Sequence, residues 1–196
     1  RGLVDDECKD EHAGVEPSGG LERSEASFLR RHWGFLLLQS SAAFLGYGMV
    51  PALIGVAASR FANSSLLLLL ATSLVCFLDP IGRGLGAHPP RSFAAVAGVW
   101  GPLGGGLVGV LLLPRHSWLF KGLGGGAALV VAYASFMTIF SYIATAQFVY
   151  IQRTEGARGA SALQIAKASS WVSAAGQVGA CLGTAVSLVL LLTGAV

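Results

Sequence analysis

The chain has 196 residues, of which 54% are hydrophobic and only 12% charged, about half the charged share of an ordinary soluble domain. Its mean hydropathy is +0.66 and its net charge +3. A soluble globule of this size cannot bury so much apolar surface, which argues against an ordinary cytosolic enzyme.

The first part of the chain is acidic and polar. Eight of the ten acidic residues lie within residues 1–25, among glycine, proline and serine. This composition is typical of disorder, and no basic stretch leads into an apolar core as in a signal peptide. We therefore expect residues 1–32 to form an acidic, disordered cytoplasmic loop, followed by a membrane domain over residues 33–196. Because the chain begins with Arg1 instead of methionine, we also expect it to be a fragment or a processed product.

Five stretches that contain no acidic residue, lysine or arginine follow, each 18 to 31 residues long. They are residues 33–59, 61–78, 92–114, 122–152 and 168–196. A bilayer core of about 30 Å is crossed by roughly 20 helical residues. Only helices satisfy their own backbone groups in lipid over such lengths, and the alternating pattern of a barrel strand is absent. The sequence therefore predicts an all-α membrane protein with five transmembrane helices.

The basic residues between these stretches predict an orientation. Seven arginines and lysines fall on the side of the acidic segment, in residues 30–31, 83–91 and 153–167. Three fall on the other side, at Arg60, Arg115 and Lys121. Positive charge concentrates in cytoplasmic loops, so we expect residues 1–32 in the cytoplasm and the C-terminus outside. The same residues are scattered singly, which argues against nucleic acid as a partner.

Small residues four apart predict where the helices pack closely. The stripes are Gly101, Gly105 and Gly109; Gly122 and Gly126; and Gly179 and Gly183. Such stripes let two helix backbones approach one another in a membrane. A phosphate-binding loop is a poor alternative, because no strand precedes these glycines and no Gly-Lys-Ser/Thr occurs.

Four polar or aromatic residues inside the stretches are candidates for binding a solute: Tyr47, Trp100, Tyr142 and Gln177. Large polar side chains are costly in a bilayer, so they either join helices by hydrogen bonds or line a path for a polar solute. Trp100 either stacks on a planar ligand or fills a gap beside the glycine stripe. We expect Tyr47, Tyr142 and Gln177 to face one shared polar cavity.

The remaining chemistry is sparse. Asp79 is followed by Pro80 and, four residues on, by Arg83, a pattern typical of a helix end rather than of a proton carrier. The three cysteines and four histidines show no metal spacing and no disulfide framework. We therefore expect no enzyme activity, no catalytic residue, no metal and no cofactor.

Four short segments resemble the eukaryotic riboflavin transporter family. They are residues 48–52 (GMVPA), 74–78 (LVCFL), 139–142 (IFSY) and 177–183 (QVGACLG). They are similar to parts of that family's seventh, eighth, tenth and eleventh spans, and the resemblance covers most of residues 35–190. The chain departs from the family pattern at Ile54, Gly55 and Val56, where family members usually carry Gln-Ser and an aromatic residue.

The resemblance implies a major-facilitator-like carrier in the plasma membrane, with eleven spans and an exoplasmic C-terminus. This chain would be its C-terminal five-helix bundle, and its partners would be riboflavin, the lipid bilayer and a missing six-span half of the same polypeptide. The solute of such carriers lies between two bundles near the midplane. The alternatives are a carrier of another small polar solute, such as a nucleoside or another vitamin, and a non-transporting membrane scaffold.

Overall fold

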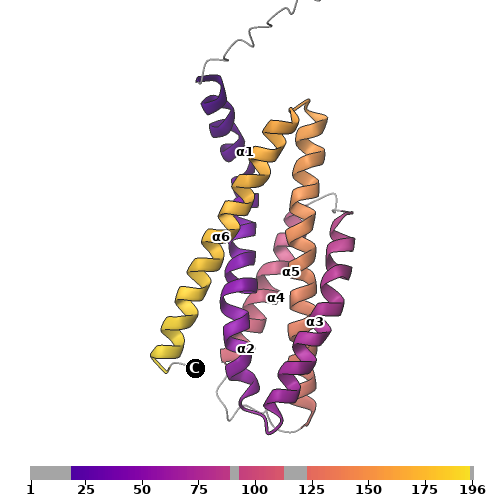
Figure 1. Ribbon diagram of the computed structural model, residues 1–196, viewed down its shortest axis with the longest axis vertical. Coiled ribbons are helices and arrows are strands. Elements are labelled where there is room, and N and C mark those ends of the chain that lie inside the picture. The colour runs from indigo at the N-terminus through magenta and orange to yellow at the C-terminus, as the bar shows by residue number, and fades with distance from the viewer. Residues whose placement is uncertain (1–18, 89–92, 113–122, 195–196) are drawn as a thin grey trace, which may run out of the picture. The chain divides into compact units, whose positions relative to one another are not determined.

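The computed structural model describes residues 19–88, 93–112 and 123–194, and the elements within these ranges are helices (Figure 1). In chain order they are α1 (Gly19–Ala43), η1 (Phe44–Met49), α2 (Val50–Ala58), α3 (Ser64–Gly86), α4 (Phe93–Leu112), α5 (Leu123–Ala157) and α6 (Ala162–Leu192). The first three follow one another without a break. No strand occurs in the described ranges, so the expectation of an all-helical chain is confirmed there.

Four helices are long and apolar enough to cross a membrane: Arg30–Ala58, Ser64–Gly86, Gly125–Ala157 and Ala162–Leu192. They indicate a membrane-embedded protein. Helix α4 occupies the remaining predicted stretch with 20 residues and no charged side chain. A fifth span through α4, and the carrier architecture, stay predictions.

The chain divides into two units, residues 1–33 and residues 34–196. In the first unit, α1 begins at Gly19, so residues 19–32 are helical where we expected disorder. The physical reason is local, because residues 19–32 contain no proline and carry several leucine, glutamate and arginine residues, which favour a helix. Residues 1–18 lie outside the described residues.

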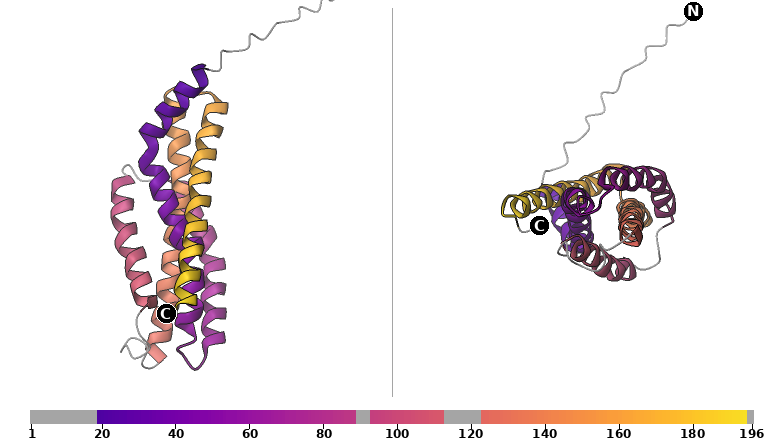
Figure 2. Two further views of the ribbon diagram at one scale, coloured as in Figure 1. Left: turned by 90° about the vertical axis from the view of Figure 1, so that its left-hand side faces the viewer. Right: turned by 90° about the horizontal axis from the view of Figure 1, so that it is seen from below.

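Helix α5 lies between α3, α4 and α6 and is the central helix of the second unit (Figure 2). Its most extensive contact is with α3, where Gly82 and Gly86 meet the backbone of α5. A Cβ at Gly86 would lie 2.8 Å from the carbonyl oxygen of Tyr142. This pair has the same four-residue spacing as the stripes named above, but our sequence interpretation did not assign it to packing.

Helix α6 packs against η1 through a second close approach. A Cβ at Gly48 would lie 2.5 Å from Cα of Gly183, and one at Gly179 would collide with the carbonyl of Ser40. The stripe expected at Gly179 and Gly183 therefore does bring two helices together. The stripe of Gly101, Gly105 and Gly109 has no described neighbour within 4 Å. Helix α4 instead turns its large apolar residues inward, and Gly104 contacts Leu45.

Within the second unit, residues 34–58 form one continuous helical rod, which we call the first rod: the last part of α1, then η1, then α2. The π-helical turn η1 interrupts its α-helical course. The amide of Val50 donates to the carbonyl of Leu45, five residues back. Pro51 follows at the start of α2, and its ring lacks an N–H and crowds the preceding turn, so the helix widens there. The buried hydroxyl of Ser187 donates to the carbonyls of Gly183 and Gly48 at 2.9 and 3.4 Å. This wider turn is the part of the rod that faces α6.

The turn between α5 and α6 is fixed by its own residues. Gly159 has a φ of +77°, a conformation that favours glycine. It lies two residues after the last residue of α5, Ala157, and turns the chain away from that helix. The Ser161 hydroxyl accepts from the Gln164 amide, and the Gln164 side chain accepts from the Ser161 amide, closing a capping box. These bonds start α6 at a defined point and set the hairpin whose two helices form walls of the site.

The outward faces of α3 and α6 are strongly apolar. Exposed side chains on α3 are Leu66, Leu69, Leu70, Leu74, Phe77, Ile81 and Leu85. Only 11% of the apolar window of α3 and 22% of that of α6 is buried within the chain. Exposure of so much apolar surface to water would be unfavourable, which is further reason to place these helices in a membrane.

Candidate functional site

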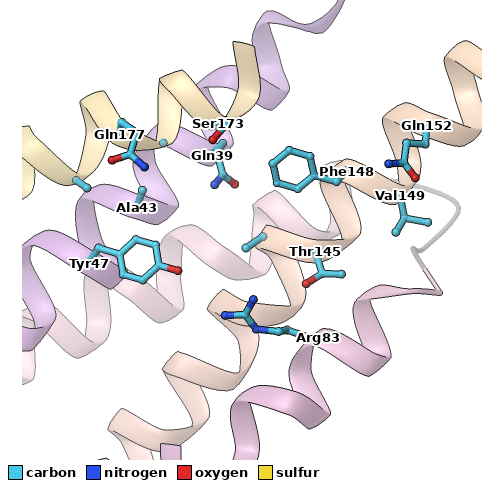
Figure 3. A pocket seen from close by; sticks show the side chains of 13 residues that line it. Gln39, Ala43, Tyr47, Arg83, Thr145, Phe148, Val149, Gln152, Ser173 and Gln177 are labelled. Atoms are coloured by element: carbon cyan, nitrogen blue, oxygen red, sulfur yellow. The ribbon is translucent and has the colours of Figure 1, made fainter. Parts of the chain in front are cut away.

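A pocket of about 370 Å³ opens between the first rod, α5 and α6, with one residue contributed by α3 (Figure 3). Apolar and polar side chains share its wall. The lining residues are Gln39, Ala43, Tyr47, Arg83, Ala144, Thr145, Phe148, Val149, Gln152, Ser173, Gly176, Gln177 and Ala180. They all belong to the four helices that are apolar enough to span a membrane.

Glycines of α6 make room for this pocket. A Cβ at Gly176 would lie 3.1 Å from Nε2 of Gln39, so glycine lets the glutamine side chain sit between the helices. One and two turns further on, Gly179 approaches the backbone of Ser40 in α1 and Gly183 that of Phe44 in η1. Helix α6 therefore lies close to the first rod at Gly179 and Gly183, and the pocket opens beside this contact, where Gln39 and Gln177 line it.

Two glutamines form a buried amide pair beside the pocket. Nε2 of Gln147 donates to Oε1 of Gln39 at 3.2 Å. Gln39 is 7% exposed and Gln147 fully buried, and Oε1 of Gln147 has no hydrogen-bond partner among the described residues. Polar groups in a membrane span are costly unless they are paired. A buried pair of glutamines therefore indicates a polar site among these apolar helices.

Tyr47 enters the pocket from the π-helical turn. Its ring meets Phe140 edge to face, with centroids 4.8 Å apart and planes at 87°. The side chain is 56% exposed, and its hydroxyl points toward the guanidinium of Arg83 (Figure 3). The widened turn thus places an aromatic ring with a polar tip on the open side of the pocket.

Arg83 is the charged residue of the pocket wall, and it is paired with Asp79, which Ser141 holds in turn. Its Nε donates to Oδ2 of Asp79 at 2.8 Å, and the Ser141 hydroxyl of α5 donates to the other carboxylate oxygen. Our expectation of a helix end at Asp79 and Pro80 is wrong, because α3 continues to Gly86 with Pro80 inside it. Proline is tolerated within membrane helices where neighbouring groups satisfy the freed backbone. Asp79 therefore lies within a span, paired with Arg83.

Of the four residues proposed to bind a solute, the pocket includes two. Tyr47 comes from η1 and Gln177 from α6, where Ser173 precedes it by one turn on the same face. Gln39, which shares a face of the first rod with Tyr47, lies beside them. Trp100 and Tyr142 are not among the lining residues.

Trp100 belongs to the apolar core instead. It is 3% exposed and stacks on Phe136, with centroids 5.0 Å apart and planes at 29°. A second ring, Phe140, lies 6.3 Å away. Nε1 of Trp100 has no hydrogen-bond partner in the described residues. Of the two interpretations left open for this residue, the structure shows the packing one.

Tyr142 lies at the contact between α5 and α3. It is partly buried and packs against the core, and its carbonyl faces Gly86. The reason is the face on which it lies: Ser141 beside it reaches Asp79 of α3, while Thr145, one turn later on α5, lines the pocket. The cavity expected for Tyr47, Tyr142 and Gln177 therefore takes Thr145 from α5 in place of Tyr142.

Several residues in or beside the pocket were not among the candidates from the sequence. Gln147 interrupts an uncharged stretch just as Gln177 does, so the same signal was present. Arg83 was counted among loop residues, and only the continuation of α3 past Pro80 brings it to the pocket. Phe148 and Val149 carry no local signal, since apolar residues occupy every face of α5.

Among the described residues, no three histidine, cysteine or acidic side chains come together as metal ligands. Comparisons with protein-family models, with curated proteins and with solved structures found no match. The described residues form helices, four of which are apolar enough to indicate a membrane-embedded protein, and a partly polar pocket lies between them.

Proposed function

We propose that the protein is part of a membrane solute carrier and that the pocket between the first rod, α5 and α6 holds its solute, with riboflavin as the leading candidate. The observation that carries the proposal is the pocket itself, a partly polar space among helices that are apolar enough to span a membrane. A scaffold that only packs against itself has no use for such a space, because unpaired polar groups in lipid are destabilising.

The pocket's chemistry suits a neutral ring system with a polar chain. Tyr47 and Phe148 supply aromatic surface, and Gln177, Ser173 and Thr145 supply amide and hydroxyl groups. Solute sites combine mostly apolar walls with a few polar groups that fix orientation. Riboflavin has a flat tricyclic ring and a hydroxylated chain, and the resemblance of residues 48–52 and 177–183 to riboflavin transporters directs the choice to it.

The proposal includes a second bundle that completes the site. Tyr47 is more than half exposed, and α3 and α6 bury little of their apolar windows within this chain. In carriers of the major-facilitator type the solute lies between two bundles that rock against one another. In this proposal the five helices of this chain form one wall of the solute site, and the second bundle of the complete protein forms the other. The carrier acts in the plasma membrane.

Uptake of radiolabelled riboflavin in riboflavin-auxotrophic cells tests this function. We expect the complete protein to restore uptake and residues 1–196 expressed alone to give none. Surface labelling must show comparable amounts of both proteins. No uptake by a well-expressed complete protein would refute the riboflavin assignment, and direct uptake of radiolabelled nucleosides or other vitamins would then identify another solute. Transport by residues 1–196 alone would refute the two-bundle model.

A further inference from the structure

We propose that Arg83 is the ligand anchor of the pocket, that Asp79 and Ser141 position it, and that it takes a neutral, carbonyl-bearing edge of the ligand instead of an anion. This inference rests on the proposed function, since it names the part of the solute that the pocket recognises. It begins from the one charged side chain among the lining residues.

The geometry fixes which part of the guanidinium faces the pocket. Nε of Arg83 is engaged by Oδ2 of Asp79 at 2.8 Å. The terminal amino groups of the guanidinium face the pocket, where the side chain is 59% exposed and the Tyr47 hydroxyl is a hydrogen-bond partner that a ligand would share or displace. A guanidinium is a planar fork whose parallel N–H groups suit two acceptors, or one acceptor with two lone pairs. An anchored fork of this kind presents a fixed pair of donors to a ligand.

Asp79 does not approach Arg83 alone. Ser141, on α5, donates to its second carboxylate oxygen, so both oxygens are engaged and the carboxylate cannot turn freely. This contact joins α3 to α5 next to Gly82, whose missing side chain lets the helices meet. The pair is therefore held by two helices, which sets the direction of the fork relative to Tyr47 and Thr145.

Charge decides between a neutral ligand and an anion. Arg83 and Asp79 cancel one another, and the other lining residues carry no formal charge. An anion would enter a site of zero net charge among apolar helices and would have to compete with Asp79 for the guanidinium, which is unfavourable at low dielectric. A neutral carbonyl accepts from the fork without that cost. The pyrimidinedione edge of a flavin and the similar edge of uracil are ligands of this class.

Binding of three probes to the purified complete protein tests the inference: riboflavin, its 5′-phosphate FMN, and uracil. We expect riboflavin and uracil to bind and FMN to bind at least tenfold more weakly than riboflavin. Arg83→Gln and Arg83→Lys should each weaken riboflavin binding roughly tenfold or more, because a charge-assisted hydrogen bond or the fork geometry is lost. Arg153→Gln is the control, since Arg153 donates to the Ala87 carbonyl away from the pocket, and it should bind riboflavin as the wild type does.

The positioning role of Asp79 has its own readout. Asp79→Asn leaves the positive charge of Arg83 uncancelled, so the preference for riboflavin over FMN should fall at least tenfold or reverse. Ser141→Ala keeps the charges and should weaken riboflavin binding without changing that preference. If Asp79→Asn lowers binding of both ligands only in proportion to the loss of folded protein, Asp79 is merely structural and the inference fails. Arg83→Lys, which keeps the charge in the span, decides the role of Arg83 if Arg83→Gln does not fold.

Failure of the proposed function is distinguishable from failure of this inference. If the wild type binds no riboflavin, the solute assignment fails, while uracil and inorganic phosphate still test the anchor. Uracil binding that Arg83→Gln abolishes would support a neutral carbonyl edge. Binding of phosphate alone, or of neither probe, would overturn it.

Discussion

At the scale of single residues, Gln177 is the most direct test of a binding role in α6. It lines the pocket from a helix whose other face is apolar. We expect Gln177→Leu to lower the apparent affinity for the transported solute roughly fivefold, the equivalent of one hydrogen bond of about 1 kcal/mol. Concentration-dependent uptake measures this, with surface expression as the reference.

Thr184→Val is the matched control for that variant. Thr184 is exposed on the same helix, and its hydroxyl donates to the carbonyl of Ala180, one turn earlier in α6, at 3.0 Å. We expect uptake by this variant to equal that of the wild type. Equal losses of uptake and of surface expression in Gln177→Leu would point to a packing role for Gln177.

Trp100 is expected to matter for stability and not for the solute. Because it is buried against Phe136, Trp100→Ala should lower the free energy of unfolding by about 3–5 kcal/mol. Trp100→Phe keeps a ring and removes an indole N–H that has no partner among the described residues, so it should retain most of the stability. Thermal unfolding of the purified protein distinguishes the two. Weaker solute binding by a stable Trp100→Phe variant would contradict the packing role.

At the scale of elements, the contact of α6 with η1 depends on glycine. A Cβ at Gly183 would meet the Phe44 carbonyl and Cα of Gly48, which are backbone atoms that cannot rotate away. We expect Gly183→Ala to push the helices apart and to cost about 1–3 kcal/mol of stability. The thermal midpoint of the purified protein reports this cost.

Gly105→Ala is the control for that substitution, because no described atom lies within 4 Å of its Cβ position. It should leave the thermal midpoint within error of the wild type. If Gly105→Ala destabilises as much as Gly183→Ala, the face of α4 that carries Gly105 packs against a partner, and the assignment of the close contact to α6 and η1 alone is wrong.

The helices were predictable from the sequence because lipid leaves the backbone few choices. An uncharged run of sufficient length has to satisfy its own N–H and C=O groups, so the stretches around α3, α5 and α6 could be assigned directly. Their ends were less certain, since Pro80 did not end α3 and Gly19 begins α1 before the expected boundary. Both differences concern residues whose surroundings, more than their own type, decide the local structure.

The pocket was predictable only in part, for a similar reason. Tyr47 and Gln177 were found because large polar groups are costly within a span, which is a property of the residue itself. Which face of a helix turns inward depends on its neighbours. Spacing alone could not show that Tyr142 lies at α3, that Trp100 stacks on Phe136, or that Gly104 and not Gly105 faces Leu45.

At the scale of the whole molecule, the distribution of basic residues predicts the orientation. In a variant that lacks Cys8, Cys76 and Cys181, a cysteine introduced at Ala157 should react with a membrane-impermeant reagent only after the cells are opened. A cysteine at Asn63, exposed in the turn before α3, should react from outside intact cells. The reverse pattern would show that the acidic segment is exoplasmic.

The central claim is that the pocket between the first rod, α5 and α6 is the site of the transported solute. The most direct measurement uses Ser173→Cys in the cysteine-free complete protein, with N-ethylmaleimide inactivation of riboflavin uptake as the readout. Riboflavin at ten times its Kd should slow the inactivation roughly tenfold, because mass action then leaves about one site in eleven empty. Thr184→Cys should show no protection. Inactivation of the Ser173→Cys protein at the same rate with and without riboflavin would contradict the claim.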